Sequence, residues 1–174
     1  MLELPRPDGI QPKHIHDARG SRLRRWPVGL VGLGILLALS FFGVFGAGAR
    51  IVATGDKVKL ILDSPSHIRN GMFFETVITI ETERDLRDAV ILVDKELWRE
   101  VTVNTILPEP TEHGFRDGAF EFRYGPLSAD ERLVVKVALQ INSGHRPSAN
   151  EGSVALADGD AILTTLNYAM EVLP

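Results

Sequence analysis

The segment RLVVKVALQIN, Arg132 to Asn142, is the clearest strand pattern in the chain. Its large apolar residues recur at every second position, with Leu133, Val135, Val137, Leu139 and Ile141 on one face. Successive side chains of a strand point to opposite faces of its sheet, so this period is typical of a strand that is buried on one side. The segment therefore predicts β-structure, and similar patterns occur on both sides of it.

The other expected strands are residues 57–62, 72–83, 89–94, 99–107, 119–124, 152–156 and 161–173. Turn-forming residues separate them, and Ala157-Asp158-Gly159-Asp160 predicts a hairpin. Seven or eight strands with frequent turns predict an all-β fold, an immunoglobulin-like antiparallel two-sheet sandwich over residues 50–174. Residues 85–98 are ambiguous, because their propensity also allows a helix.

Two stretches resemble the immunoglobulin-like domains of bacterial envelope proteins, including the CARDB-type adhesion-related group. They are VKLILDSPSHIRNGMFFETVITIETERDLRDAVILVD, from Val58, and EFRYGPLSADERLVVKVALQIN, from Glu121. The shared features are a turn led by Gly71, alternation from Phe74 to Ile80, and an L-x-x-x-E turn from Leu127 to Glu131. The resemblance covers residues 56–174. It implies a binding or spacer module and no reaction.

Ahead of the expected sandwich lies RRWPVGLVGLGILLALSFFGVFGAGAR, Arg24 to Arg50, which has no charge between Arg25 and Arg50. As a helix, Val28 to Ala49 would span roughly 33 Å, enough for a hydrocarbon core of about 30 Å. We therefore expect a transmembrane helix over residues 27–49. The alternative is a signal peptide cleaved at Ala47-Gly48-Ala49, preceded by the basic residues Arg22, Arg24 and Arg25.

Charge predicts how the chain is oriented. Residues 1–26 carry six Lys/Arg and three Asp/Glu (net +3), and residues 50–174 carry thirteen and twenty (net −7), which together give the net −4 of the chain. Positive flanks favour the cytoplasmic side. We expect a disordered cytoplasmic tail over residues 1–26, a single pass through the plasma (inner) membrane, and an extracytoplasmic domain. The acidic domain argues against nucleic acid as a partner.

The chain contains no cysteine, which excludes disulfides and thiol catalysis and favours a bacterial envelope. Within the expected helix, small residues are spaced four apart at Gly34 and Ala38 and again at Gly43 and Ala47. Such pairs allow two helices to approach closely. They predict helix-mediated association with another membrane protein or a second copy.

Two long polar segments, residues 108–118 and 143–152, are expected to be loops. Loops on a rigid scaffold often carry binding residues, and aromatic and cationic side chains commonly anchor interfaces. The candidate partner-binding residues are His113, Phe115, Arg116, His145 and Arg146.

Motifs for catalysis are weak. His67, His113 and His145 lie in three expected loops and could converge on a metal, which leaves a tethered or secreted ligand- or metal-binding domain as the alternative. Asp158-Gly159-Asp160 lacks the downstream ligands of a calcium loop. No serine has a nucleophile-elbow context, and no phosphate-binding loop is present.

The sequence therefore predicts no catalytic residue, no metal and no cofactor. The expected function is a non-enzymatic scaffold or accessory subunit that binds a partner, another membrane or envelope protein, at the outer face of the membrane. A sensor, with the first 25 residues as its cytoplasmic output, is a third alternative.

Overall fold

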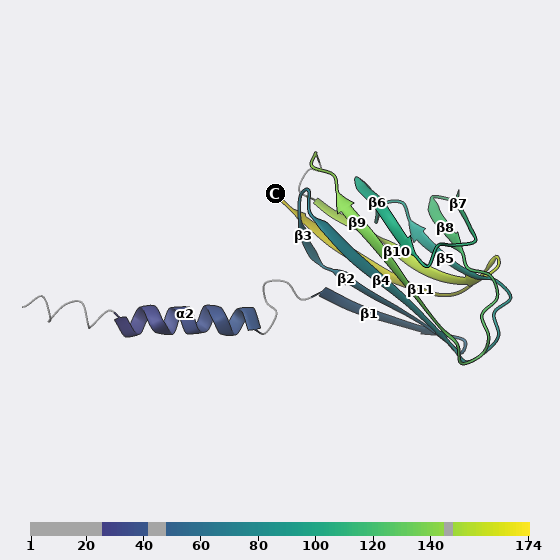
Figure 1. The fold of residues 1–174 in the computed structure, drawn as a ribbon, viewed down its shortest axis with the longest axis horizontal. Coiled ribbons are helices and arrows are strands. Elements are labelled where there is room, and N and C mark those ends of the chain that lie inside the picture. The colour runs from purple at the N-terminus through teal and green to yellow at the C-terminus, as the bar shows by residue number, and fades with distance from the viewer. Residues whose placement is uncertain (1–25, 42–47, 145–147) are drawn as a thin grey trace, which may run out of the picture. The chain divides into compact units, whose positions relative to one another are not determined.

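The computed structural model describes residues 26–41, 48–144 and 148–174, which belong to two separate units, Met1–Phe45 and Gly46–Pro174. The first unit contains helix α2 (Trp26–Phe41). The second contains β1 (Gly48–Gly55), β2 (Val58–Pro65), β3 (His67–Arg69), β4 (Phe73–Thr82), β5 (Ala89–Asp94), β6 (Val101–Leu107), β7 (Glu112–Arg116), β8 (Ala119–Arg123), β9 (Arg132–Ile141), β10 (Ser148–Asp158) and β11 (Ala161–Leu173) (Figure 1).

These strands form two sheets. Sheet A has the order β1-β2-β4-β9-β6, and sheet B has the order β3-β11-β10-β5-β8-β7. Neighbouring strands are antiparallel, except that β3 runs parallel to β11. The predicted immunoglobulin-like sandwich is thus confirmed as a two-sheet β-fold, with eleven strands in the described part of the chain instead of seven or eight.

The core lies between the sheets because each strand turns alternate residues inward. Strand β9 buries Val135, Val137 and Leu139, as its pattern predicts, and Ile78 and Ile80 of β4 lie beside it on the same face. Sheet B supplies the opposing layer, in which Ile91, Val93, Val154, Leu156, Leu166 and Met170 are buried. The same alternation leaves residues such as Lys136 exposed on the outer face.

Three sequence predictions in this unit are wrong. Residues 143–152 are not a loop throughout, since β10 begins at Ser148. Residues 108–118 are not a continuous loop, since Glu112–Arg116 form β7. Gly48 and Ala49 do not extend the helix, because they begin β1. Small residues hide the strand period there: Ala49, Ile51 and Ala53 pack against the core, while the residues between them face outward. The ambiguous region from residue 85 contains strand β5, whose Ala89 to Val93 are largely buried.

Helix α2 was expected to belong to a transmembrane span over residues 27–49. In the part of the chain that the structure describes, no helix has the length and apolar character needed to cross a membrane. Gly34 and Ala38 lie on α2 and are exposed, and no atom outside the helix lies within 4 Å of a Cβ built on Gly34. Gly43 and Ala47, like the N-terminal tail, lie outside the described residues.

Two tyrosines of the sandwich differ in their hydrogen bonding. The Tyr168 hydroxyl of β11 donates to the carbonyl oxygen of Pro65 and so ties sheet B to the end of β2 in sheet A. The Tyr124 hydroxyl, just after β8, is buried and has no hydrogen-bond partner among the described residues, and burial raises the pKa of Tyr124 to about 12. A buried polar group contributes to stability only when it is paired.

We therefore expect opposite outcomes from two matched substitutions. Tyr168→Phe should lower the free energy of unfolding by about 1 kcal/mol, because it removes a hydrogen bond and leaves a carbonyl unpaired. Tyr124→Phe should change it by less than about 0.5 kcal/mol or raise it, because it removes a hydroxyl that has no partner. Urea denaturation of both variants measures the difference. A larger loss for Tyr124→Phe than for Tyr168→Phe would contradict these hydrogen-bond assignments.

Candidate functional site

The sandwich is closed at one side and open at the other. At the closed side β1 and β2 contact β11, and a Cβ added to Gly55 would lie 2.5 Å from the carbonyl oxygen of Leu163. A glycine is therefore needed for the two sheets to approach here. Strands β6 and β7, the last strands of the two sheets, lie at the other side (Figure 1). We call the region formed by β6, β7 and β8 the open side.

An aromatic cluster runs from the core to the surface at the open side. Trp98, just before β6, is buried, and its ring centroid lies 5.7 Å from those of both Phe120 and Phe122 of β8. Phe115 of β7 meets Phe120 edge-on, with a centroid separation of 5.3 Å, and is 58% exposed. We define the aromatic cluster as Trp98, Phe115, Phe120 and Phe122. Its outermost ring is available for contact with another molecule.

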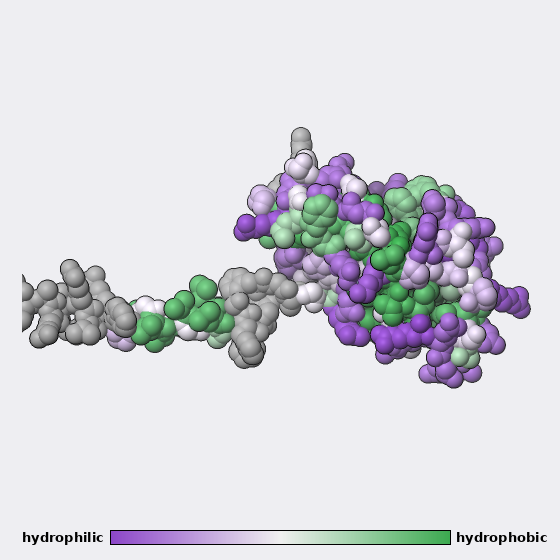
Figure 2. Space-filling model, viewed as in Figure 1, coloured by the Kyte–Doolittle hydropathy of each residue, from purple (hydrophilic) through white to green (hydrophobic). Residues whose placement is uncertain are grey.

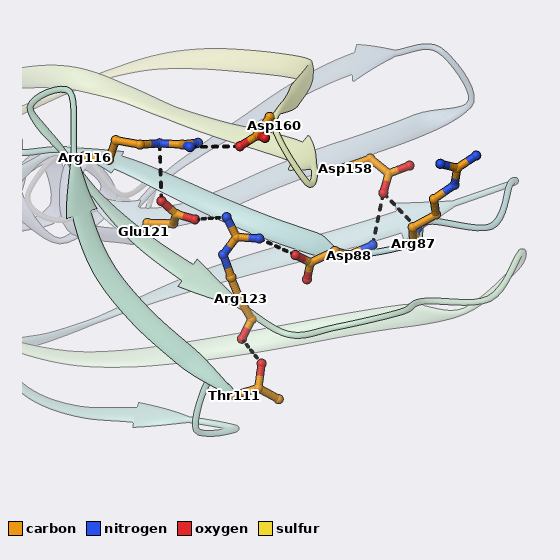
Figure 3. A network of polar contacts seen from close by, with 8 residues as sticks. All are labelled: Arg87, Asp88, Thr111, Arg116, Glu121, Arg123, Asp158 and Asp160. Carbon is orange, nitrogen blue, oxygen red and sulfur yellow. Dashed lines mark hydrogen bonds and ion pairs between the residues drawn. The ribbon is translucent and has the colours of Figure 1, made fainter.

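A polar network covers the outer face of sheet B (Figure 3). Glu121 of β8 is buried and accepts contacts from two guanidinium groups, those of Arg123 and Arg116, the latter at 3.6 Å. Arg123 also pairs with Asp88, ahead of β5. The pKa of Arg123 is raised, first by its hydrogen bond to Asp88 and then by that to Glu121. The network joins β7, β8 and the start of β5.

The β10–β11 hairpin is connected to this network at two points. Asp160 accepts a hydrogen bond of 2.8 Å from Arg116, which lowers the pKa of Asp160 and raises that of Arg116. Asp158 accepts the backbone amides of Arg87 and Asp88 at 2.8 and 3.0 Å. The predicted hairpin turn is confirmed, and Gly159 adopts a positive φ of 64° in it. Both carboxylates are thus used within the domain.

The structure brings three of the five predicted partner-binding residues together on one strand. His113, Phe115 and Arg116 all belong to β7, where strand alternation places Arg116 on the face opposite His113 and Phe115. Arg116 pairs with Glu121 and Asp160 on the outer face of sheet B. Phe115 instead packs against Phe120, which lies on the core-facing side of β8. His145 and Arg146 lie outside the described residues.

The histidines do not support a shared metal site. His67 lies on β3 and contacts Glu171 at 3.2 Å, while His113 lies on β7 at the opposite edge of the same sheet. Within residues 26–41, 48–144 and 148–174, no group of three or more His, Cys, Asp or Glu side chains is arranged to hold a metal ion. His145, the third candidate, is outside those ranges.

The hollows of the described sandwich include an open groove and a small internal void. An open groove of about 670 Å³ crosses the end of sheet A near the β1–β2 turn. Its charged lining residues are paired in part, since Glu81 contacts Lys59 at 3.4 Å and Arg132 at 3.7 Å. Between the sheets, a void of about 10 Å³ beside Trp98 and Tyr168 has room for roughly one water molecule.

Similarity between this chain and known proteins is limited to distant likenesses among solved structures. No protein-family model matches the chain, and neither does any curated protein sequence. Similar solved structures include a non-cellulosomal cohesin from Archaeoglobus fulgidus (11% identity, 68% of this chain, 93% of that chain, TM-score 0.42). They also include a CARDB domain from Pyrococcus furiosus, solved with di-metal ions (8% identity, 72% and 89% coverage, TM-score 0.42).

The sequence patterns did not indicate that strand β6 lies at the edge of its sheet. The run VTVNTIL, Val101 to Leu107, was recognised as a strand but not as an edge strand, although it carries no charge. Val103 and Leu107 are exposed in it. Figure 2 shows hydrophobic surface interrupting the hydrophilic surface on the visible face of the sandwich. The large exposed apolar residues of this unit are Val52, Met72, Phe73, Val103, Leu107, Phe115, Ile162 and Leu173.

The network makes a stability prediction for Glu121. Glu121→Gln should lower the free energy of unfolding by about 1–3 kcal/mol, because a buried carboxylate between two guanidinium groups is replaced by a neutral amide. The matched control is Glu75→Gln, since Glu75 contacts Lys136 at 3.9 Å with both side chains more than half exposed. That variant should lose less than about 1 kcal/mol. Equal losses in urea denaturation would show that the network is not stabilising.

The Arg116–Asp160 pair predicts a pH dependence. Because the pKa of Asp160 is lowered on folding, the pair stabilises the fold fully above the usual carboxylate pKa and loses this effect as pH falls through the folded pKa. The difference in unfolding free energy between the wild type and Asp160→Asn should therefore be constant near neutrality and shrink below about pH 4. Urea titrations across this range measure it. A difference that persists unchanged to about pH 2 would contradict the pairing.

Proposed function

We propose that the chain is a non-enzymatic protein-binding module and that the partner docks at the open side of the sandwich. The observation that carries this proposal is the position of Phe115, which is exposed, stacked on Phe120, and connected through the aromatic cluster to the core. Aromatic residues supported in this way lose little conformational freedom on binding and often dominate interface energies.

The paired charges and the tight packing between the sheets favour binding a protein at the surface over binding a small substrate inside the sandwich. The charged side chains of the polar network pair with one another, and they are Arg116, Glu121, Arg123 and Asp160. Because they are paired, they stabilise the sandwich and are poorly placed to act as reactive groups. The void between the sheets has about the volume of one water molecule. A protein surface needs no enclosed pocket, because shape complementarity over an exposed patch suffices.

We also propose that the module is tethered to a membrane, with the sandwich on the extracytoplasmic side. Support comes from the uncharged stretch between Arg25 and Arg50 and from α2, whose large apolar residues are exposed all around the helix. A helix that is apolar on every side needs lipid or protein around it. Release of the full-length chain from the membrane fraction by an alkaline wash would contradict tethering.

The docking proposal predicts a difference between two exposed phenylalanines. The full-length chain with a C-terminal tag is crosslinked in its native cells, and the co-purifying proteins are quantified by mass spectrometry. Phe115→Ala should reduce recovery of a stoichiometric partner by about tenfold, because it removes an interface anchor. Phe73→Ala is the matched control, since Phe73 is 67% exposed and lies on β4 of the other sheet. Equal recovery from both variants would contradict docking at the open side.

A further inference from the structure

The outermost strands of the two sheets are β1, β6, β3 and β7, and they differ in how well they are protected from further pairing. Strand β3 has three residues, and β7 has five with Glu112, His113 and Arg116 among them. Strand β1 has a glycine at each end, carries Arg50, and contacts β11. Strand β6 has seven residues with no charge, no glycine and no proline.

An edge strand presents backbone N–H and C=O groups that can pair with another chain, and natural proteins usually place charges on such strands to prevent this. Strand β6 lacks that protection. Five of its seven residues are β-branched, namely Val101, Thr102, Val103, Thr105 and Ile106, which favours an extended conformation. Val103 is 39% exposed and Leu107 is 59% exposed.

Strand β6 also borders the apolar interior. Val101, Val103 and Ile106 pair with Ile141, Leu139 and Val137 of β9, all of which face the core. Trp98 of the aromatic cluster lies three residues before β6 in the chain. A strand added beyond β6 would therefore turn every second side chain toward the open side of the sandwich, where Phe115 is exposed.

We infer that β6 is a strand-addition site, at which an extended segment of a partner protein joins sheet A. The inference rests on the proposed protein-binding function and names its surface and its mode of recognition. Backbone hydrogen bonds along β6 supply affinity, and alternate apolar side chains of the segment supply specificity on the core-facing side. The register of β6 on β9 shifts between Val103 and Thr105, so we expect an added segment to pair in two short ladders, one on each side of Asn104.

Charge at the two ends of β6 indicates the chemistry of the segment. Glu100 precedes the strand and Glu109 follows it closely, and neither forms an ion pair with any residue that the structure describes. Arg99, the cation next to Glu100, already contacts Glu96 at 3.6 Å. The matching segment has an uncharged core of alternating apolar and β-branched residues with Lys or Arg near its ends.

A second copy of this chain fits the site less well than such a segment. In an antiparallel pairing of β6 with itself, Glu100 of one copy would approach Glu109 of the other at both ends of the ladder. Like charges opposite one another destabilise a ladder. Electrostatics thus favours a different, cationic-flanked chain over self-association.

A library of random 12-residue peptides displayed on phage tests the inference on the full-length chain in detergent. Recovered peptides should carry Lys or Arg flanking an alternating apolar core. When synthesised with a fluorescent label, they should bind the wild type and lose about tenfold in affinity for Val103→Lys by anisotropy, because a charge then lies on the pairing edge. The matched control is Val52→Lys on β1, where Val52 is 47% exposed. It should bind within about twofold of the wild type.

Charge reversal gives an independent check. Glu109→Lys should weaken binding of the Lys- or Arg-flanked peptides and strengthen binding of the same peptides with Glu at those positions. Hydrogen exchange should slow at the β6 amides when peptide is bound. Circular dichroism and thermal melting of each variant confirm that it is folded.

Several results would overturn strand addition at β6. They are a failure to enrich any peptide, equal binding to Val103→Lys and the wild type, and a dimer in sedimentation equilibrium that Val103→Lys abolishes. The last result would make a second copy the occupant. Peptides or partners that depend on Phe115 but not on Val103 would leave the proposed binding function standing while removing β6 as its site.

Discussion

The structure depends on burying the inward faces of two sheets against each other. Strand β9 lies between β4 and β6 in sheet A, and its alternate residues meet the layer that β5, β10 and β11 supply from sheet B. Because a strand has a period of two, this packing fixes which residues face outward as well as which face in. The charged network on sheet B and the exposed side chains of sheet A follow from the same register.

The two sheets contact each other closely at the β1–β11 side of the sandwich, and the opposite side, formed by β6, β7 and β8, is left accessible. Gly55 allows β1 to approach β11 so closely that a side chain would collide with the Leu163 carbonyl, and the Tyr168 hydroxyl connects β11 to the end of β2. No comparable contact between β6 and β7 is found among the described residues. The polar network instead holds β7 and β8 to β5 and to the β10–β11 hairpin, which keeps the aromatic cluster in place. The part of the open side that β7 and β8 form is therefore held by side-chain contacts on both of its faces.

Sequence periodicity predicted the central strands well, because strands such as β4 and β9 have large apolar residues at alternate positions. Periodicity failed where small or polar side chains give no apolar alternation. Ala49 and Ala53 of β1 are too small to give a recognisable apolar alternation. Because Gly48 and Ala49 directly follow a long apolar stretch, they were assigned to the predicted helix. Strand β7 was predicted as loop because His113, Gly114 and Arg116 have no hydrophobic alternation, and its strand form depends on pairing with β8, which lies later in the chain.

In the candidate site, too, the sequence predicted some features and missed others. Phe115 and Arg116 were predicted as binding residues from residue type and from their place in an expected loop, yet their neighbours assign them different roles, since Arg116 is held by Glu121 and Asp160 while Phe115 remains exposed. Whether a cation is available to a partner depends on carboxylates distant in sequence, such as Asp160, which a local pattern does not reveal. The lack of charge on β6 was visible in the sequence, but its meaning required the sheet order, because an uncharged strand is ordinary at the centre of a sheet and unusual at its edge. In the proposed strand addition, the partner would be selected through backbone pairing and shape at this uncharged edge, and Glu100 and Glu109 would set the preferred charge at its two ends.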